Sequence, residues 1–199
     1  MAKGNKIENI NLTMRKIANS KKVRDGVLKE VEKKVKAVKN DLLREFNSHP
    51  VTQELDSGSS GSNSSGLLGG IGNLFGYIGF SSSSRPTSAV KSLLKRITVK
   101  RMKKARKVTK KGFTLRVEVK WINTSDIESV SRMPWEPGSG IMGIERGISG
   151  LGYYLNLRGE GRSKGGIQSK RKVRAGQFRT TKYLPAMLLQ AEKILRSSK

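Results

Sequence analysis

Residues 23–50 read VRDGVLKEVEKKVKAVKNDLLREFNSHP, and this stretch decides the fold. Its apolar residues recur at alternating spacings of three and four, at Leu28, Val31, Val35, Val38 and Leu42. That spacing places them on one face of a helix. Charged residues fill the other positions, so the helix must lay a narrow apolar stripe on something else. Because proline disfavours helical backbone at the residue before it, we predict a long helix over residues 23–47 that ends at His49-Pro50.

The segment after this helix is first polar and then unusually rich in glycine and large apolar residues. A Ser/Gly run fills residues 56–66, and residues 66–80 read GLLGGIGNLFGYIGF. A solvated linker contains Gly and Ser, but not this density of large apolar side chains. We therefore predict that residues 67–80 lie against a neighbouring subunit, with the interface formed by Leu67, Leu68, Leu74, Phe75, Tyr77, Ile78 and Phe80.

The composition narrows the function classes. The 199 residues include one histidine, no cysteine and a formal net charge of +26. The lack of cysteine excludes disulfides, thiolate catalysis and cysteine zinc sites, and a single histidine argues against a histidine metal site. No apolar run is long enough to span a bilayer, so we expect no membrane segment. The charge predicts a polyanionic partner or an acidic neighbour.

The positive charge is concentrated in two regions. Residues 91–111 contain eleven Lys and Arg and no acid, and residues 158–182 contain nine against Glu160 alone. Apolar and polar residues alternate over 113–121, and a shorter alternation lies upstream at Ile97 and Val99. A basic stretch joins the two, which predicts an antiparallel hairpin with a basic tip at 100–112. The residues predicted to face a polyanion are Lys100, Arg101, Lys103, Lys104, Arg106, Lys107, Lys110, Lys111, Arg171, Lys172 and Arg174. Nucleic acid and an acidic protein surface remain equal alternatives for that polyanion.

The other segments complete an α+β prediction. Residues 1–21 have weak periodicity and are interpreted as a flexible or partner-bound basic arm. Residues 22–199 are predicted to form a single α+β domain, in which the long N-terminal helix and a C-terminal helix pack on a small antiparallel β-sheet with long loops. Within it we expect an extended Gly/Ser loop at 56–86, a short helix at 87–95, an irregular stretch at 122–140, a short helix and a turn at 141–157, and an amphipathic helix at 184–196.

Catalytic and cofactor patterns are weak. The acidic residues Glu54, Asp126, Glu128, Glu136 and Glu145 form no recognisable pair in the sequence. The glycines at 70–76 have the wrong spacing for a dinucleotide turn, and Ser149 lacks the final glycine of a nucleophile elbow. We therefore expect no enzyme activity, no cofactor, no metal and no small-molecule substrate. Trp135, between two prolines, is interpreted as a packing or interface residue.

Several strings in the chain resemble neck and tail-completion proteins of large contractile-tailed bacteriophages. The first block is His49-Pro50-Val51-Thr52 with residues 69–80, and the second includes Pro134-Trp135, residues 144–154 and residues 166–170. The resemblance covers roughly residues 22–196. Where the wider tail-completion family has a shorter Pro-x-x-Thr-Gly-x-Leu stretch after the first helix, this chain has a Ser/Gly insertion.

The resemblance implies a structural virion protein without catalysis. Such subunits form a ring at the head–tail junction and join the connector to the tail, as neck, tail-completion or tail-terminator proteins. It implies a homo-oligomeric ring (hexamer or dodecamer), partners among other neck or connector and tail-tube or sheath proteins, and a location in the virion after assembly in the host cytoplasm. Further interface residues would be Trp135, Ile148, Tyr153 and Tyr154. Non-specific DNA contact stays open, and the alternative function is a basic nucleic-acid-binding protein of ribosomal or chromosomal type.

Overall fold

A computed structural model describes residues 13–67, 73–102, 106–109, 112–131, 141–144 and 181–197. The helices are α2 (Lys21–Ser48), α3 (Pro50–Asp56), α4 (Leu74–Ile78), α5 (Pro86–Lys95), α6 (Thr124–Val130) and α8 (Leu184–Arg196), with 3₁₀ turns η1 (Gly58–Ser60) and η2 (Ile141–Ile144). The strands are β1 (Thr98–Met102), β2 (Arg106–Thr109), β3 (Gly112–Thr114) and β4 (Val117–Lys120). The predicted α+β class is confirmed.

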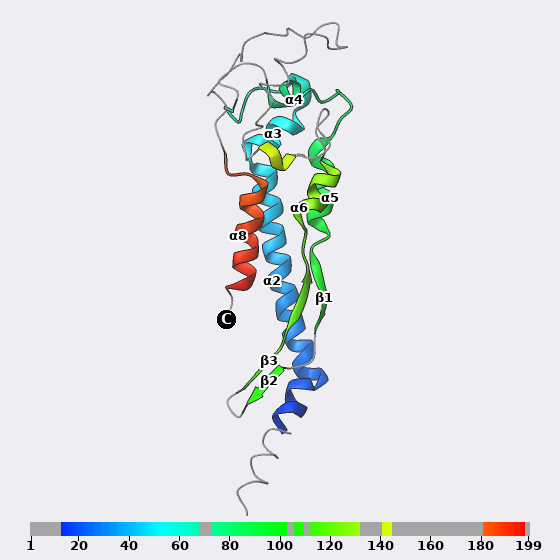
Figure 1. The fold of residues 1–199 in the computed structure, drawn as a ribbon, viewed down its shortest axis with the longest axis vertical. Helices are drawn as coiled ribbons and strands as arrows, with labels where there is room; N and C mark the ends of the chain where they lie inside the picture. The colour runs from blue at the N-terminus through cyan, green and yellow to red at the C-terminus, as the bar shows by residue number, and fades with distance from the viewer. Residues whose placement is uncertain are drawn as a thin grey trace, which may run out of the picture.

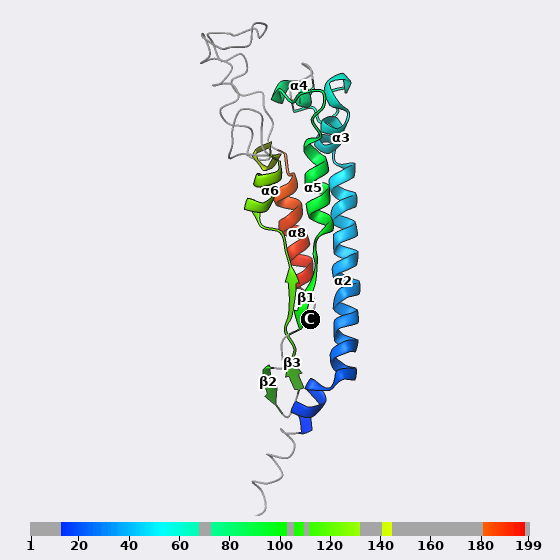
Figure 2. The same ribbon diagram turned by 90° about the vertical axis from the view of Figure 1, so that its right-hand side faces the viewer.

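The described residues form an elongated rod with α2 running along most of its length (Figure 1). Helices α3 and α4 lie at one end, called the upper end here as in Figure 1, and strands β2 and β3 lie at the lower end. Figure 2 shows α5, α8 and β1 on one side of α2, which leaves the opposite side of α2 on the outside of the rod.

Helix α2 confirms the prediction from its apolar spacing. The Ser20 hydroxyl caps its first turn by accepting a hydrogen bond from the backbone N–H of Val23 at 3.4 Å. His49 has extended backbone, so the helix ends where the proline predicted. The buried side chains lie in its second half and are Val35, Val38, Leu42 and Phe46.

Part of the predicted N-terminal arm is helical. Residues 13–19, within the segment interpreted as a flexible or partner-bound arm, form a short helix before α2. Ala18 is fully buried, and the Asn19 side chain donates to the backbone carbonyl of Arg15 at 3.0 Å. One small buried residue carries too little periodicity to be recognised in the sequence. Residues 1–12 lie outside the described residues.

The region predicted as an extended Gly/Ser loop contains local structure. Pro50 opens α3 directly after α2, η1 follows, and α4 forms within the glycine-rich segment. Gly79 ends α4 with a left-handed backbone (φ 83°), a conformation that favours glycine. The short helix predicted at 87–95 is present as α5, with Pro86 in its first turn.

The predicted hairpin is present and has two paired parts. Strands β1 and β4 are antiparallel, with Val99 opposite Val119 and Met102 opposite Val117, and the register shifts between Val99 and Arg101. Strands β2 and β3 also pair antiparallel, so the basic stretch itself contributes strands. Val99 and Val119 pack against the core, as the alternation predicts.

The C-terminal half departs from the prediction in two places. Residues 122–140 were predicted to be irregular, but Asn123 and Asp126 form a capping box that starts α6. Helix α8 has the predicted bounds, yet it packs mainly along α2 (Figure 1), whereas β1 packs on another part of α2. Helix α2 therefore joins α8 and the sheet. Of the segment 141–157, residues 141–144 form η2 and the remainder lies outside the described residues.

Candidate functional site

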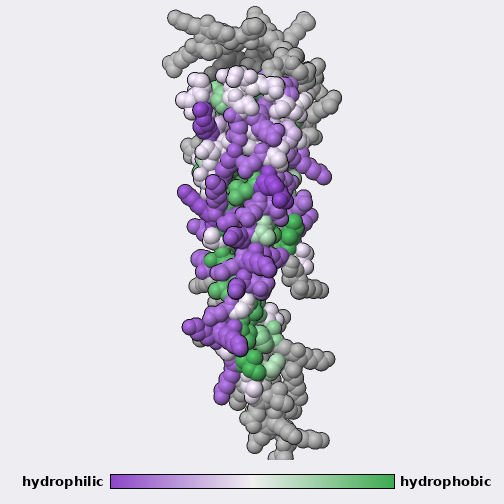
Figure 3. Space-filling model, turned by 180° about the vertical axis from the view of Figure 1, so that it is seen from behind, coloured by the Kyte–Doolittle hydropathy of each residue, from purple (hydrophilic) through white to green (hydrophobic). Residues whose placement is uncertain are grey.

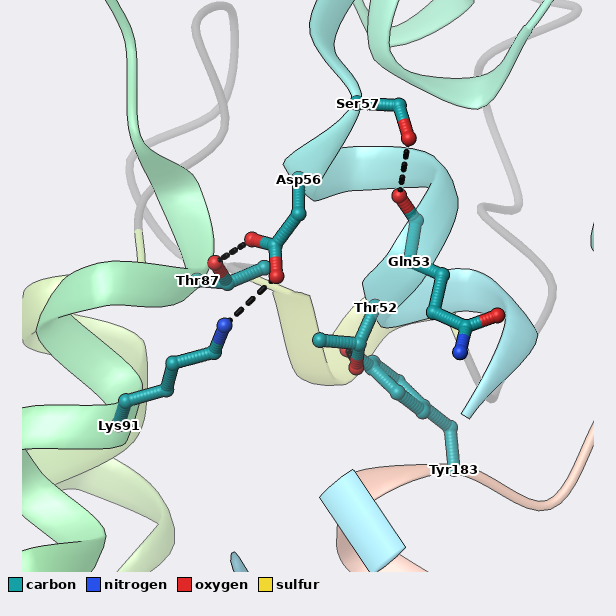
Figure 4. A network of polar contacts seen from close by, with 7 residues as sticks. All are labelled: Thr52, Gln53, Asp56, Ser57, Thr87, Lys91 and Tyr183. Carbon is teal, nitrogen blue, oxygen red and sulfur yellow. Dashed lines mark hydrogen bonds and ion pairs between the residues drawn. The ribbon is translucent and has the colours of Figure 1, made fainter. Parts of the chain in front are cut away.

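Polar contacts around α3 join parts of the chain that are far apart in sequence (Figure 4). The Asp56 carboxylate accepts hydrogen bonds from the Thr87 hydroxyl and from the Lys91 ammonium, the latter at 2.6 Å. The hydroxyls of Thr52 and Tyr183 lie 2.8 Å apart in a buried hydrogen bond. These contacts fix α3 to α5 and to the residue that precedes α8.

Glu54, one of the carboxylates considered for catalysis, binds the backbone of the glycine-rich segment. Its side chain is fully buried. One carboxylate oxygen accepts the backbone N–H of Leu74 at 2.5 Å, and the other accepts that of Ser65 at 2.9 Å. Buried backbone donors need such partners, so Glu54 holds the backbone of Ser65 and of Leu74 against α3.

Asn73 also binds the backbone next to the glycine-rich segment. It was not among the residues predicted from the sequence. Its side-chain oxygen caps α4 by accepting the Gly76 N–H at 2.7 Å. Its amide nitrogen lies within 2.9 Å of three backbone carbonyls, those of Gly58, Ser59 and Gly61. An asparagine directly before a short apolar run was the available signal for this cap.

His49 and Tyr183 lie together where α2 meets α3. Their rings are 4.8 Å apart, and the His49 Nδ1 accepts the backbone N–H of Val51 at 3.3 Å. Burial lowers the pKa of His49, opposed by a backbone hydrogen bond to Lys182 and by the charge of Glu45. Burial also raises the pKa of Tyr183 above its usual value. Both side chains are therefore neutral in the fold near pH 7.

The lowered pKa of His49 predicts a loss of stability in mild acid. The unfolded chain binds a proton near pH 6.5, while the folded chain resists it, so stability is full above pH 6.5 and falls as the pH drops through the folded pKa. The slope should approach about 1.4 kcal/mol per pH unit at most. Urea unfolding between about pH 5 and 7 measures it, and a His49→Gln variant should show a flatter profile. An equal slope in both proteins would contradict the assignment, because this is the one histidine of the chain.

The predicted subunit-interface residues divide into three groups. Leu67, Leu74, Phe75 and Ile78 are each at most 3% exposed and belong to the core of their own chain, which corrects their assignment to an interface. Helix α4, which contains Leu74, Phe75 and Ile78, packs on α3. Tyr77 and Phe80 are half-buried at the edge of that core, and an interface role for them stays a prediction. Leu68, Trp135, Ile148, Tyr153 and Tyr154 lie outside the described residues.

Four of the predicted polyanion-facing residues lie in the described strands of the hairpin. Lys100 is exposed and lies 3.5 Å from the Glu118 carboxylate, a contact of little energetic weight at the surface. Arg101 lies in β1, and Arg106 and Lys107 lie in β2. Strand β2 lies with β3 at the lower end of the rod, and β1 runs along its middle part (Figure 2). The others, Lys103, Lys104, Lys110, Lys111, Arg171, Lys172 and Arg174, lie outside the described residues.

A groove of about 600 Å³ runs between α2 and α8. Its apolar lining consists of Val38, Leu42, Ala191 and Ile194, and its polar lining consists of Asp41, Arg44, Glu45, Ser48 and Gln190. Ile194 is 46% exposed, and Leu189 on the same helix is 55% exposed. Because exposed large apolar residues around an apolar groove mark interaction surfaces, this groove is a candidate interface. This groove was not predicted from the sequence.

Figure 3 shows the rod from behind, with hydrophilic residues over most of the visible face and hydrophobic residues in patches in the middle and toward the lower end. The described residues include no group of three or more His, Cys, Asp or Glu side chains that could hold a metal ion. Among the same residues, no helix is both long and apolar enough to cross a membrane.

No protein-family model, curated protein or solved structure matches this chain.

Proposed function

We propose that this chain is a non-enzymatic structural subunit that assembles into a ring at a phage head–tail junction and joins the connector to the tail. The observation that carries the proposal is the groove between α2 and α8, at whose edge the apolar side chain of Ile194 is exposed to solvent. A structural subunit needs such a surface in addition to its own core, because the core residues are already covered within the chain.

The groove has the composition of a protein interface. Leu42 and Ala191 form an apolar floor, and Ile194 stands exposed at its edge. Asp41 and Glu45 supply charged groups around this floor. Interfaces between protein subunits combine an apolar centre with a polar rim in the same way. We therefore place the contact between neighbouring subunits here rather than on the glycine-rich segment.

The string His49-Pro50-Val51-Thr52, which carries part of the resemblance to tail-completion proteins, has a packing role at each position. His49 caps α3, and Pro50 opens it. Val51 is buried, and Thr52 binds Tyr183. The polar residues of this region thus bind the chain itself, which supports a structural rather than a catalytic use of the string.

Ring formation can be tested with one substitution in the groove. The purified chain is expected to sediment as a ring of six or twelve subunits, and Ile194→Asp should weaken association about tenfold or more, because a charge replaces an apolar contact. Analytical ultracentrifugation with mass measurement gives the stoichiometry. Lys193→Asp is the matched control, since Lys193 is an exposed neighbour outside the groove lining.

Two outcomes would contradict this proposal. A chain that stays monomeric at all concentrations and does not bind isolated connectors or tails has no role in joining them. A ring that Ile194→Asp leaves intact would place the subunit contact elsewhere. The position in the virion is checked by antibody labelling of purified particles, where label at the junction is the expected result.

A further inference from the structure

We propose that the lower end of the rod is a DNA-binding surface, formed jointly by residues 13–24 and the β-hairpin. The ligand is the phosphate backbone of double-stranded DNA, bound without sequence preference. This inference adds a partner to the proposed function and rests on it only for the choice of double-stranded DNA. The helical segment 13–24 is the part of this surface that was not predicted to face a polyanion. Most of it falls in residues 1–21, which were interpreted as a flexible or partner-bound arm.

Residues 13–24 form a basic helical surface. They include five basic residues and no acid: Arg15, Lys16, Lys21, Lys22 and Arg24. The side chains of Arg15, Lys16, Lys21 and Lys22 are exposed. Ser20 separates the two helical pieces, so these charges lie on two successive helix segments at the end of the rod.

The hairpin adds a second basic element beside the first. No acidic residue occurs between Arg96 and Val117, a stretch that includes all of β2 and β3. Lys100 and Arg116 are exposed at its base. Figures 1 and 2 agree in placing β2 and β3 next to residues 13–24, and β1 packs on α2. Two segments about 80 residues apart in the sequence therefore form one surface.

Acidic residues outnumber basic ones in one stretch of the upper half of the rod, whereas Asp25 and Glu118 are the acids that border the basic surface. Residues 41–56, at the junction of α2 and α3, contain four acids against a single basic residue: Asp41, Glu45, Glu54 and Asp56 against Arg44. Residues 13–24 thus carry net positive charge, whereas residues 41–56 carry net negative charge, part of which pairs with Lys91 of α5. Such a separation orients a polyanion toward the lower end and speeds its encounter.

The high share of lysine among the charged residues favours DNA over an acidic protein as the partner. Lysine is depleted in the centres of protein–protein interfaces, whereas protein–DNA interfaces are strongly positive and polar. Within residues 13–24, Ile17 is the large apolar side chain that is exposed, against the four exposed basic side chains of Arg15, Lys16, Lys21 and Lys22. A two-stranded β-ribbon is also narrow enough to enter the major groove. We therefore take the phosphate backbone as the ligand.

The test compares two triple variants of equal net charge in the full chain. Lys16→Gln/Lys21→Gln/Lys22→Gln removes lower-end charge, and Lys29→Gln/Lys33→Gln/Lys36→Gln removes exposed charge from the middle of α2. Fluorescence anisotropy with a labelled random duplex of about 30 base pairs, over about 50–200 mM KCl, gives affinity and salt slope. The lower-end variant should bind about tenfold to a hundredfold more weakly, with a slope smaller by about two to three. The mid-helix control should change little.

Three results would overturn the inference: no binding by the unmodified chain, equal losses in both variants, or polyglutamate competing as well as DNA at equal charge. Equal losses would mean that only total charge matters, and effective polyglutamate competition would favour an acidic protein partner. Circular dichroism of both variants excludes misfolding as the cause. Ring formation is scored separately through Ile194→Asp, so a failed ring with the expected DNA result rejects the proposed function and supports the DNA surface.

Discussion

Replacing Phe75 with alanine is expected to lower the free energy of unfolding of the isolated chain by about 3–5 kcal/mol. The Phe75 side chain is 1% exposed, and its ring lies 5.4 Å from that of Phe80. Truncation removes a large buried apolar surface and leaves a cavity that the short helix α4 can close only in part. Urea unfolding followed by circular dichroism measures the change.

Leu189→Ala is the matched control for this experiment. Leu189 is 55% exposed on α8, so its truncation should change the unfolding free energy by no more than about 0.5 kcal/mol. If Phe75→Ala instead left the isolated chain as stable as before and only dissociated an oligomer, Phe75 would be an interface residue, as its glycine-rich surroundings suggested.

Phe75 also illustrates what the sequence can and cannot predict. Helices α2 and α8 and the β1–β4 pair follow from apolar spacing, which is a local property. We predicted that the apolar residues of 67–80 need a surface that covers them, and this prediction is correct for those that the structure describes. Whether that surface belonged to the same chain or to a neighbour depends on contacts such as Glu54 with Leu74, which are 20 residues apart. No local pattern encodes such contacts.

Two of the short helices that were missed, α6 and residues 13–19, had different signals. Asn123 and Asp126 form a capping box that is readable in the sequence, but the prolines and glycine that follow at 134–138 favoured an irregular interpretation. Residues 13–19 have one buried residue, Ala18, and so lack the periodicity that identifies a helix.

The candidate surfaces were predictable to different degrees. The basic hairpin follows from a run of Lys and Arg between two alternating segments. The groove between α2 and α8 does not, because it depends on how two distant helices align. That alignment is supported by Lys34, which donates to the carbonyls of Ile194 and Leu195 at 2.9 and 3.4 Å, where α8 ends. A cation at a helix C-terminus is favourable there, and it fixes the position of Ile194 beside the groove.

Replacing Glu54 with alanine should destabilise the chain by about 2–5 kcal/mol, because two backbone donors lose their partner and the fully buried site gains a cavity. Those donors, the N–H groups of Ser65 and Leu74, belong to the segment that covers α3. Hydrogen exchange should therefore accelerate first at these two amides. Gln53→Ala is the control, since Gln53 is exposed on the same helix and its carbonyl bonds to Ser57 do not involve the side chain.

Glu54→Gln separates the hydrogen bonds from the volume of the side chain. The amide keeps the size of the carboxyl group but offers one acceptor oxygen, so one of the two backbone donors faces an N–H₂ group instead. The loss of stability should lie between those of Gln53→Ala and Glu54→Ala, with the faster exchange confined to one of the two amides. If Glu54→Gln were as stable as the unmodified chain, shape alone would explain why this position is buried, and the carboxylate would be free for another role. If instead both amides exchange as fast as in Glu54→Ala, the carboxylate acts as a single clamp, because losing one bond would release the whole segment from α3.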